Sequence, residues 1–235
     1  MEVSIKSITT DNLTKYIAEF ARVCYRRDEK ESTADQDFNR CKQLWKDGHQ
    51  TPFESINIDF LVEDVSRSLL AQITRYRHAT FCVESQRYVN YKDGIKFVYP
   101  DSFHGVLIFD DIVTAYCQAI GSGCKPEDAR CILPNATPTR FRMVVNLREF
   151  FHIYQQRSDV HAQKEIKDLV ALMFNKLYNM VDKNSQDLLL FIVCNTKISI
   201  KTLIKDIESA RDNENCDHNF AEDIMRILKE YKGLV

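Results

Sequence analysis

Two kinds of apolar spacing alternate along the chain, and together they limit the folds that it can adopt. Apolar residues recur at every second position in three segments, which predicts strands at residues 2–8, 55–62 and 139–145. They recur every three to four positions in longer segments, which predicts helices at about 12–24, 35–47, 66–77, 104–121, 147–157, 162–181, 185–194 and 217–232. Pro126 starts a further short helix that ends near Arg130. We therefore predict an α+β fold in a single domain over residues 1–235.

Charge and hydropathy limit the partners of this chain. It carries 32 basic and 34 acidic side chains among 235 residues, so a long basic surface for nucleic acid is not expected. The longest apolar run, LLLFIVC at 188–194, is far shorter than the roughly 18 residues that a membrane span needs. The opening residues, MEVSIKSITTDN, do not have the pattern of a signal peptide. We expect a soluble cytoplasmic protein with neither a nucleic-acid nor a membrane partner.

Cysteine and glycine usage excludes several common sites. The eight cysteines include no C-x-x-C pair, and the closest pairs, Cys117–Cys124 and Cys124–Cys131, are seven residues apart. We therefore expect buried, reduced thiols and no metal site. The chain has only six glycines and no glycine-rich phosphate loop. A phosphate-bearing ligand would have to be held by arginines, hydroxyl groups and helix N-termini.

The segment RYRHATFCVESQRY, residues 75–88, concentrates arginines in a chain of nearly balanced charge. It is predicted to leave a helix end, pass through a loop and enter an extended segment, SQRYVNY. Arg75, Arg77 and Arg87 stand beside Ser85 and Gln86 without a matching acidic run, which favours an anion site. The alternative is that these arginines bind no ligand, and only complement the negative end of a helix dipole while they face the solvent. Cys82 with His78 as a nucleophile and base is the weaker hypothesis, since no third residue would orient them.

Two further segments have ambiguous patterns when each is taken alone. In GHQTPFE, residues 48–54, His49, Thr51 and Glu54 follow a predicted helix, and an ordinary turn would explain them equally well. In residues 129–166, Arg148 and His152 lie four apart on one helix face, and Arg157 follows at the helix end. That arrangement fits either a salt bridge or a ligand.

Taken together, these segments resemble the flavin-dependent thymidylate synthases, the ThyX family. The family signature R-H-R-x(7)-S-x-R is matched by Arg75-Tyr76-Arg77, seven residues, and Ser85-Gln86-Arg87. Four further blocks match the family in order: G-H-x-T-P-F-E at 48–54, A-R-x-x-L-P at 129–134, N-x-R at 146–148 and R-x-D-x-x-A-Q-x-E-I at 157–166. The resemblance covers residues 48–166.

The resemblance implies an antiparallel sheet with packed helices, assembled as a homotetramer with active sites at subunit interfaces. It implies FAD, reduced by NADPH, and transfer of a methylene group from 5,10-methylenetetrahydrofolate to dUMP, giving dTMP. It assigns flavin binding to His49, Thr51, Glu54, Arg75, Arg77, His78, Asn146, Arg148 and His152. It assigns dUMP binding to Gln72, Arg75, Ser85, Gln86, Arg87, Arg130 and Arg157, with Ser85 and Arg157 as catalytic residues. Arg157 would stabilise negative charge on the pyrimidine carbonyl.

Several positions depart from the family pattern. Tyr76 replaces the central histidine, Thr80 a serine and Cys82 an asparagine, and Val83 occupies the position of a family acid, with Glu84 one residue later. These changes leave two alternatives open. One is a paralogue that modifies another pyrimidine nucleotide, for example by hydroxymethylation. The other is a non-catalytic protein that binds FAD or a nucleotide.

Overall fold

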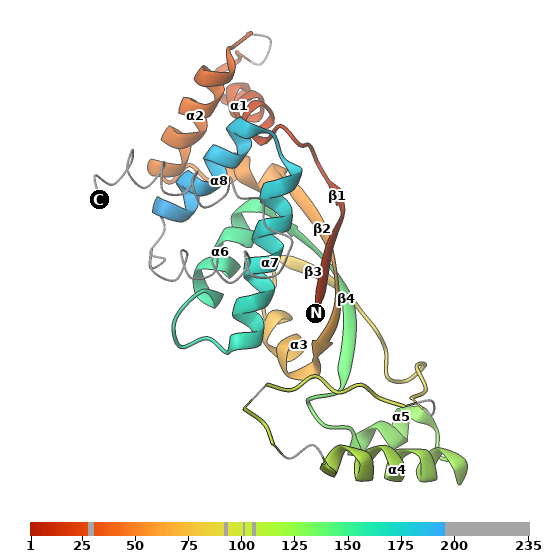
Figure 1. Cartoon of the computed structure of the whole chain (residues 1–235). Coiled ribbons are helices and arrows are strands. Elements are labelled where there is room, and N and C mark those ends of the chain that lie inside the picture. Colours follow the sequence, from red (N-terminus) through yellow and green to blue (C-terminus); the bar gives the residue numbers. More distant parts are fainter. Residues whose placement is uncertain (28–30, 92–93, 101, 105–106, 196–235) are drawn as a thin grey trace. The chain divides into compact units, whose positions relative to one another are not determined.

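The computed structural model describes residues 1–27, 31–91, 94–100, 102–104 and 107–195 (Figure 1). The described chain divides into two compact units. Unit 1 comprises Met1–Glu2 and Leu61–Met143, and unit 2 comprises Val3–Phe60 and the described residues from Val144 on. The helix predicted at 217–232 lies outside the described residues.

Four strands form one sheet in the order β1-β2-β4-β3. They are β1 (Glu2–Ile8), β2 (Asn57–Ser66), β3 (Ala79–Val83) and β4 (Pro138–Asn146). The alternation predicted for 139–145 is confirmed, because Phe141 and Met143 are buried in β4 while Arg140 and Arg142 are exposed. The structure is thus an antiparallel sheet with packed helices, which confirms the α+β prediction.

The described residues of unit 2 form the α-helices α1 (Leu13–Arg22), α2 (Ala34–Lys46), α6 (Leu147–Arg157), α7 (Lys164–Met180) and α8 (Lys183–Asn195). Helix α1 packs against α2 and α8, and α6 packs against α7. Short 3-10 helices, η1 (Val23–Tyr25) and η2 (Thr51–Ser55), follow α1 and α2. No helix in the described residues is both long and apolar enough to cross a bilayer.

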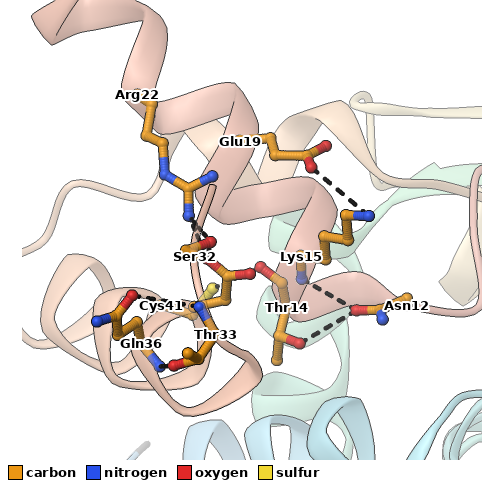
Figure 2. Close-up of polar contacts among 10 residues, drawn as sticks. Asn12, Thr14, Lys15, Glu19, Arg22, Ser32, Thr33, Gln36 and Cys41 are labelled. Atoms are coloured by element: carbon orange, nitrogen blue, oxygen red, sulfur yellow. Dashed lines mark hydrogen bonds and ion pairs between the residues drawn. The ribbon is translucent and has the colours of Figure 1, made fainter. Parts of the chain in front are cut away.

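The N-termini of α1 and α2 are fixed by capping side chains, as Figure 2 shows. The side chain of Asn12 accepts a hydrogen bond of 3.0 Å from the backbone N–H of Lys15, which starts α1. Thr33 and Gln36 form a reciprocal capping box at the start of α2, with hydrogen bonds of 3.3 and 3.2 Å. Local sequence therefore sets where both helices begin.

Unit 1 contains α3 (Arg67–Ile73), α4 (Leu107–Gly121), α5 (Pro126–Ala129) and the 3-10 helix η3 (Arg130–Ile132). Helix α4 packs against α5 and η3 around the fully buried Tyr116. The rings of Tyr91 and Tyr116 pack edge-on with their centroids 6.1 Å apart. This contact packs the segment after β3 against the small core.

The prediction of an extended segment at SQRYVNY was wrong. The strand of this region is β3, which begins six residues earlier along the chain, and residues 86–88 form a turn. Pairing with β4 decides this register: the N–H of Glu84 donates to the carbonyl of Arg140 at 2.9 Å, directly after β3 ends. A sheet partner that is more than 50 residues away cannot be read from local spacing.

The seven cysteines of the described chain are free thiols. Only Cys41 and Cys194 are buried, and Cys24, Cys82 and Cys131 are exposed, so the expectation of buried thiols was wrong for most of them. Cys41 is fully enclosed, and its thiol donates to the carbonyl of Thr14 at 3.3 Å. Burial, together with the charge of Asp37, raises the pKa of Cys41 to about 12.

We expect Cys41 to be unreactive toward a thiol reagent such as DTNB at pH 8. A pKa of about 12 instead of 9.0 lowers the thiolate population about a thousandfold, and burial also denies access. Cys24, which is exposed, is the internal comparison and should react with DTNB at the rate of an accessible thiol. Peptide mapping by mass spectrometry after a short labelling pulse would identify each site, and labelling of Cys41 at the rate of Cys24 would contradict this packing.

Candidate functional site

Arg75, Tyr76 and Arg77 form a corner between α3 and β3 in unit 1. The tyrosine side chain is buried, with 7% exposure, whereas both arginines are exposed. The backbone N–H of Tyr76 donates to the carbonyl of Ile73 at 3.3 Å, so the corner continues directly from the helix end. The inward ring of Tyr76 anchors the corner, and the two guanidinium groups are left toward solvent, where an anion can reach them.

The structure does not support Cys82 and His78 as a nucleophile and base. Cys82 lies inside β3, whose residues Ala79–Val83 are extended. At about 3.3 Å per residue, roughly 10 Å of chain separates Ala79 from Cys82. His78 precedes even Ala79, so the strand holds the two side chains too far apart for a direct hydrogen bond.

A turn after β3 carries Ser85, Gln86 and Arg87. The carbonyl of Ser85 accepts the backbone N–H of Tyr88 at 3.2 Å and of Val89 at 3.0 Å. The hydroxyl of Ser85 accepts the N–H of Arg87 at 3.3 Å. These bonds fold the turn upon Ser85, whose side chain and that of Gln86 are half-buried while Arg87 is exposed.

Arg87 and Arg130 converge on the short helix α5. The Nε of Arg87 donates to a carboxylate oxygen of Glu127 at 3.1 Å, and the Nε of Arg130 donates to the carbonyl of Glu127 at 3.0 Å. Two arginines predicted to bind dUMP therefore share one neighbour, although they are 43 positions apart in the sequence. Because both side chains are exposed, their remaining N–H groups can donate to a phosphate.

Glu84, the acid one position later than in the family pattern, is hydrogen-bonded within unit 1. The hydroxyl of Tyr91 donates to the Glu84 carboxylate at 3.0 Å, and the guanidinium of Arg67 donates to the Glu84 carbonyl at 2.9 Å. Burial, followed by the hydrogen bond to Glu84 and its charge, raises the pKa of Tyr91 to about 12, so this phenol stays a proton donor at neutral pH. The hydrogen bonds of Glu84 to Tyr91 and Arg67 therefore stabilise the start of the Ser85 turn.

In unit 2, the GHQTPFE turn meets the start of α6. Glu54, in η2, forms an ion pair with Arg148, the second residue of α6. The backbone joins the same two elements, since the N–H of Leu147 donates to the carbonyl of Ile56 at 2.9 Å. Phe53 is buried and packs edge-on against Trp45 of α2, with the ring centroids 5.1 Å apart, which stabilises the position of the turn. Glu54 and Arg148, which are 94 residues apart, thus become neighbours.

Other residues assigned to the flavin lie around this junction. The side-chain oxygen of Asn146 accepts the N–H of Glu149 at 2.8 Å and caps α6. His152, one turn after Arg148, is exposed and bonded to Gln156 at 2.9 Å. His49 and Thr51 are exposed at the entry to η2. Asn146 therefore has a structural role in addition to any contact with a ligand.

The structure brings together part of the predicted site within each unit. Unit 1 contains Gln72, Arg75, Arg77, His78, Ser85, Gln86, Arg87 and Arg130, and within it Arg87 and Arg130 meet at Glu127. Unit 2 contains His49, Thr51, Glu54, Asn146, Arg148, His152 and Arg157, and within it Glu54 and Arg148 meet. Gln72 bonds the carbonyl of Ser68 within α3, and Arg157 is half-buried as the last residue of α6.

Sequence reasoning missed Glu127, Tyr91 and Arg67, which support the Ser85 turn and its arginine. One signal was present for Glu127: it follows Pro126 at the first turn of a helix and precedes Arg130 by three residues. No local signal marks Tyr91 or Arg67, because each meets Glu84 only through the fold.

Comparison with known proteins agrees with these features. The family described as "Thymidylate synthase complementing protein" matches residues 8–181. The flavin-dependent thymidylate synthase of Haloarcula marismortui is 34% identical over 159 residues, which are 54% of this chain and 64% of that protein. That of Clostridium tetani is 28% identical over 207 residues, 75% of this chain and 83% of that protein. The chain spans 64% of the length of the Haloarcula protein, and 69% and 58% of the flavin-dependent thymidylate synthases of Halobacterium salinarum and Geobacter sulfurreducens.

Solved structures with a similar fold include the following two. One is ThyX from Helicobacter pylori with FAD and dUMP, at 20% identity and a TM-score of 0.65, covering 80% of this chain and 97% of that one. The other is a UMP/dUMP methylase from Streptomyces cacaoi bound with 5-Br dUMP, at 18% identity and a TM-score of 0.67, covering 80% and 93%.

The fold is that of the ThyX class, an antiparallel α+β structure. The match over residues 8–181, which is most of the chain, is more specific than the fold: this protein belongs to the thymidylate synthase complementing protein family, the flavin-dependent thymidylate synthases.

Proposed function

We propose that the chain is a flavin-dependent thymidylate synthase that converts dUMP to dTMP with 5,10-methylenetetrahydrofolate and NADPH. The observation that carries this proposal is the convergence of Arg87 and Arg130 on Glu127 beside the Ser85 turn. It gives the signature motif an exposed pair of guanidiniums, which suits a phosphomonoester in a chain without a glycine-rich loop. The family match supports the chemistry beyond phosphate binding.

The donors present fit an anionic flavin cofactor. In unit 2, His49, Thr51, Arg148 and His152 are exposed, and together with Glu54 and Asn146 they are proposed to supply hydrogen bonds and positive charge for FAD. In unit 1, the exposed Arg75, Arg77 and His78 are proposed to bind the same cofactor. Reduced FAD supplies a hydride when it is bound. The ion pair between Glu54 and Arg148 fixes the guanidinium at the start of α6, so little side-chain entropy would be lost when a phosphate accepts from it.

The chain's own residues would bind and polarise the nucleotide. Gln72, Ser85, Gln86, Arg87 and Arg130 are proposed to hold dUMP, Arg87 and Arg130 through its phosphate and Ser85 through its hydroxyl donor. Arg157 is proposed to donate to the pyrimidine carbonyl and to stabilise the negative charge that develops there. Ser85 and Arg157 are thus the proposed catalytic residues.

We further propose that both units belong to one domain of the family, a homotetramer in the cytoplasm with active sites at subunit interfaces. The family match supports the first part of this proposal, since it runs through residues of both units. No nucleic-acid or membrane partner is proposed.

The test is the flavin spectrum followed by turnover. Purified protein should be yellow, with the two absorbance bands of oxidised flavin, and dUMP should perturb them. Anaerobic incubation with NADPH, methylenetetrahydrofolate and dUMP should yield dTMP, identified by its mass. A colourless protein that cannot be reconstituted with FAD would contradict the proposal.

A paralogue acting on a different pyrimidine nucleotide is the second candidate. The observation that favours it is that Val83 occupies the position of the family acid, while the Glu84 carboxylate is bonded to Tyr91. A product heavier by a hydroxymethyl rather than a methyl group would select this candidate. Flavin binding without turnover of any pyrimidine nucleotide would identify a non-catalytic paralogue.

Replacing Cys82 with alanine should leave turnover within about twofold of the unchanged protein. Cys82 is exposed in a strand, and the extended chain keeps it away from His78. The rate of dTMP formation under saturating substrates is the measurement, with Cys131→Ala, another exposed cysteine, as the matched control. Complete loss of turnover with FAD still bound would instead indicate a thiol nucleophile.

A further inference from the structure

Glu84 stands where the Ser85 turn leaves the sheet, and hydrogen bonds hold it at its N–H, its carbonyl and its carboxylate. The N–H donates to the carbonyl of Arg140 in β4 at 2.9 Å, and the carbonyl accepts from the guanidinium of Arg67 at 2.9 Å. The carboxylate accepts from the hydroxyl of Tyr91 at 3.0 Å. The first two bonds fix the backbone of Glu84, whereas the third joins the two ends of the turn, because Glu84 and Tyr91 are seven positions apart.

Tyr91 is itself anchored in the small core of unit 1. Its side chain is buried and packs with Tyr116 of α4 and Ala129 of α5, which are buried as well. Helices α4 and α5 are in contact (Figure 1), and α5 carries Glu127, whose carboxylate accepts from Arg87. One core therefore supports both the far end of the turn and the partner of its arginine.

The bonds inside the turn are local and start from one residue. The carbonyl of Ser85 accepts the N–H of Tyr88 at 3.2 Å and the N–H of Val89 at 3.0 Å. These bonds shape the turn, and the bond between Tyr91 and Glu84 returns its far end to the end of β3. A loop that is closed in the free protein has less conformational freedom to lose when a ligand binds, so the closed turn should bind more tightly.

We propose that Tyr91 is a positioning residue for the nucleotide, and that its hydroxyl acts through Glu84 to hold the Ser85 turn in the conformation that binds dUMP. This inference rests on the proposed function, in which Ser85, Gln86 and Arg87 of the turn bind dUMP. The chain has no glycine-rich loop to hold a phosphate, so its affinity depends on how well these side chains are positioned beforehand. Loss of the Tyr91 hydroxyl should raise KM and leave kcat nearly unchanged, because bound dUMP orders the turn again.

The test compares Tyr91→Phe with Tyr116→Phe in the full chain loaded with FAD. Both variants remove one hydroxyl from the same core, but the Tyr116 hydroxyl is buried without a hydrogen-bond partner among the described residues. Tyr91→Phe should raise the KM and the dissociation constant for dUMP about tenfold and change kcat by less than about twofold. Tyr116→Phe is the matched control and should change none of these quantities.

Amide hydrogen exchange, followed by mass spectrometry of short peptides across residues 84–91, reports on the turn without any substrate. In the free protein, the N–H groups of Tyr88 and Val89 should exchange about tenfold faster in Tyr91→Phe and at unaltered rates in Tyr116→Phe. Glu84→Gln keeps an acceptor for the Tyr91 hydroxyl and should behave like the unchanged protein, which separates the hydrogen bond from the charge. Circular dichroism melts would establish that each variant is folded.

Exchange rates in Tyr91→Phe equal to those of the unchanged protein would overturn the proposal, as would faster exchange with an unaltered KM for dUMP. An equal effect in Tyr116→Phe would also overturn it, since the packing of the core, and not the hydroxyl, would then be the cause. If the unchanged protein binds no dUMP, the proposed function is refuted. The exchange rates of the free protein would still decide whether Tyr91 holds the turn.

Discussion

Replacing Arg87 with alanine is expected to weaken dUMP binding by about ten- to a hundredfold and to change FAD binding little. A charge-assisted hydrogen bond contributes about 1.5–3 kcal/mol, and 1.4 kcal/mol corresponds to a tenfold change in affinity. Arg87 is exposed, so its loss leaves no cavity and the fold should be unaffected. Titration of the flavin absorbance with dUMP would give the affinity, and FAD retention on gel filtration would report the cofactor.

The matched control for this prediction is Glu127→Gln. It removes the carboxylate that holds Arg87 at 3.1 Å but keeps the side chain's length and leaves the backbone carbonyl that Arg130 contacts. Because the Glu127 carboxylate offsets part of the Arg87 charge without using its remaining N–H groups, Glu127→Gln should bind dUMP at least as tightly as the unchanged protein. If Arg87→Ala weakens FAD binding more than dUMP binding, the division of the two sites proposed above is wrong.

Replacing Asp37 with asparagine is expected to lower the free energy of unfolding by about 3–5 kcal/mol. The change removes the partner of Arg22, whose side chain is only 10% exposed, and leaves a buried guanidinium without its counter-charge. It also weakens the acceptor for Ser32, which bonds the same carboxylate. Urea unfolding followed by circular dichroism would give the change in free energy.

Two further variants separate the buried pair from surface charge. Lys15→Ala breaks the exposed Lys15–Glu19 pair of 3.9 Å on the same helix, and should change the free energy of unfolding by less than about 0.5 kcal/mol. The double variant Arg22→Met/Asp37→Leu removes both buried charges and should recover much of the loss caused by Asp37→Asn. An Asp37→Asn protein as stable as the Lys15→Ala protein would show that the pair contributes little.

The two structural neighbours bear on the alternatives for substrate. The Streptomyces cacaoi protein is described as a UMP/dUMP methylase, and the Helicobacter pylori protein was crystallised with FAD and dUMP. Both share the fold with this chain at 20% identity or less, so the fold alone does not choose between their substrates. The Ser85 turn is where this chain departs from the family pattern: the Glu84 carboxylate accepts a hydrogen bond from Tyr91, and Val83 stands in the position of an acid.

Much of the fold was predictable from local spacing. The strand of residues 139–145 and the helix of 147–157 agree with β4 and α6 to within one residue, because each has a clear period and Asn146 marks the helix start. The segment that failed was 79–91, where the apolar alternation of ATFCV is interrupted on both sides by charged residues. Its strand, β3, forms because it is hydrogen-bonded to the backbone of β4, a contact that only the tertiary fold provides.

The sequence by itself determined the family, the order of the main elements and the residues of the signature, since motif spacing and apolar period are properties of the chain alone. Only the tertiary structure decided that Arg87 meets Arg130 at Glu127, that Glu54 holds Arg148, and that Tyr76 turns inward between two exposed arginines. These features either join residues that are far apart in the sequence or depend on the burial of a side chain. The physical reason is that ion pairs and packing are set by distance in space, which local spacing does not encode.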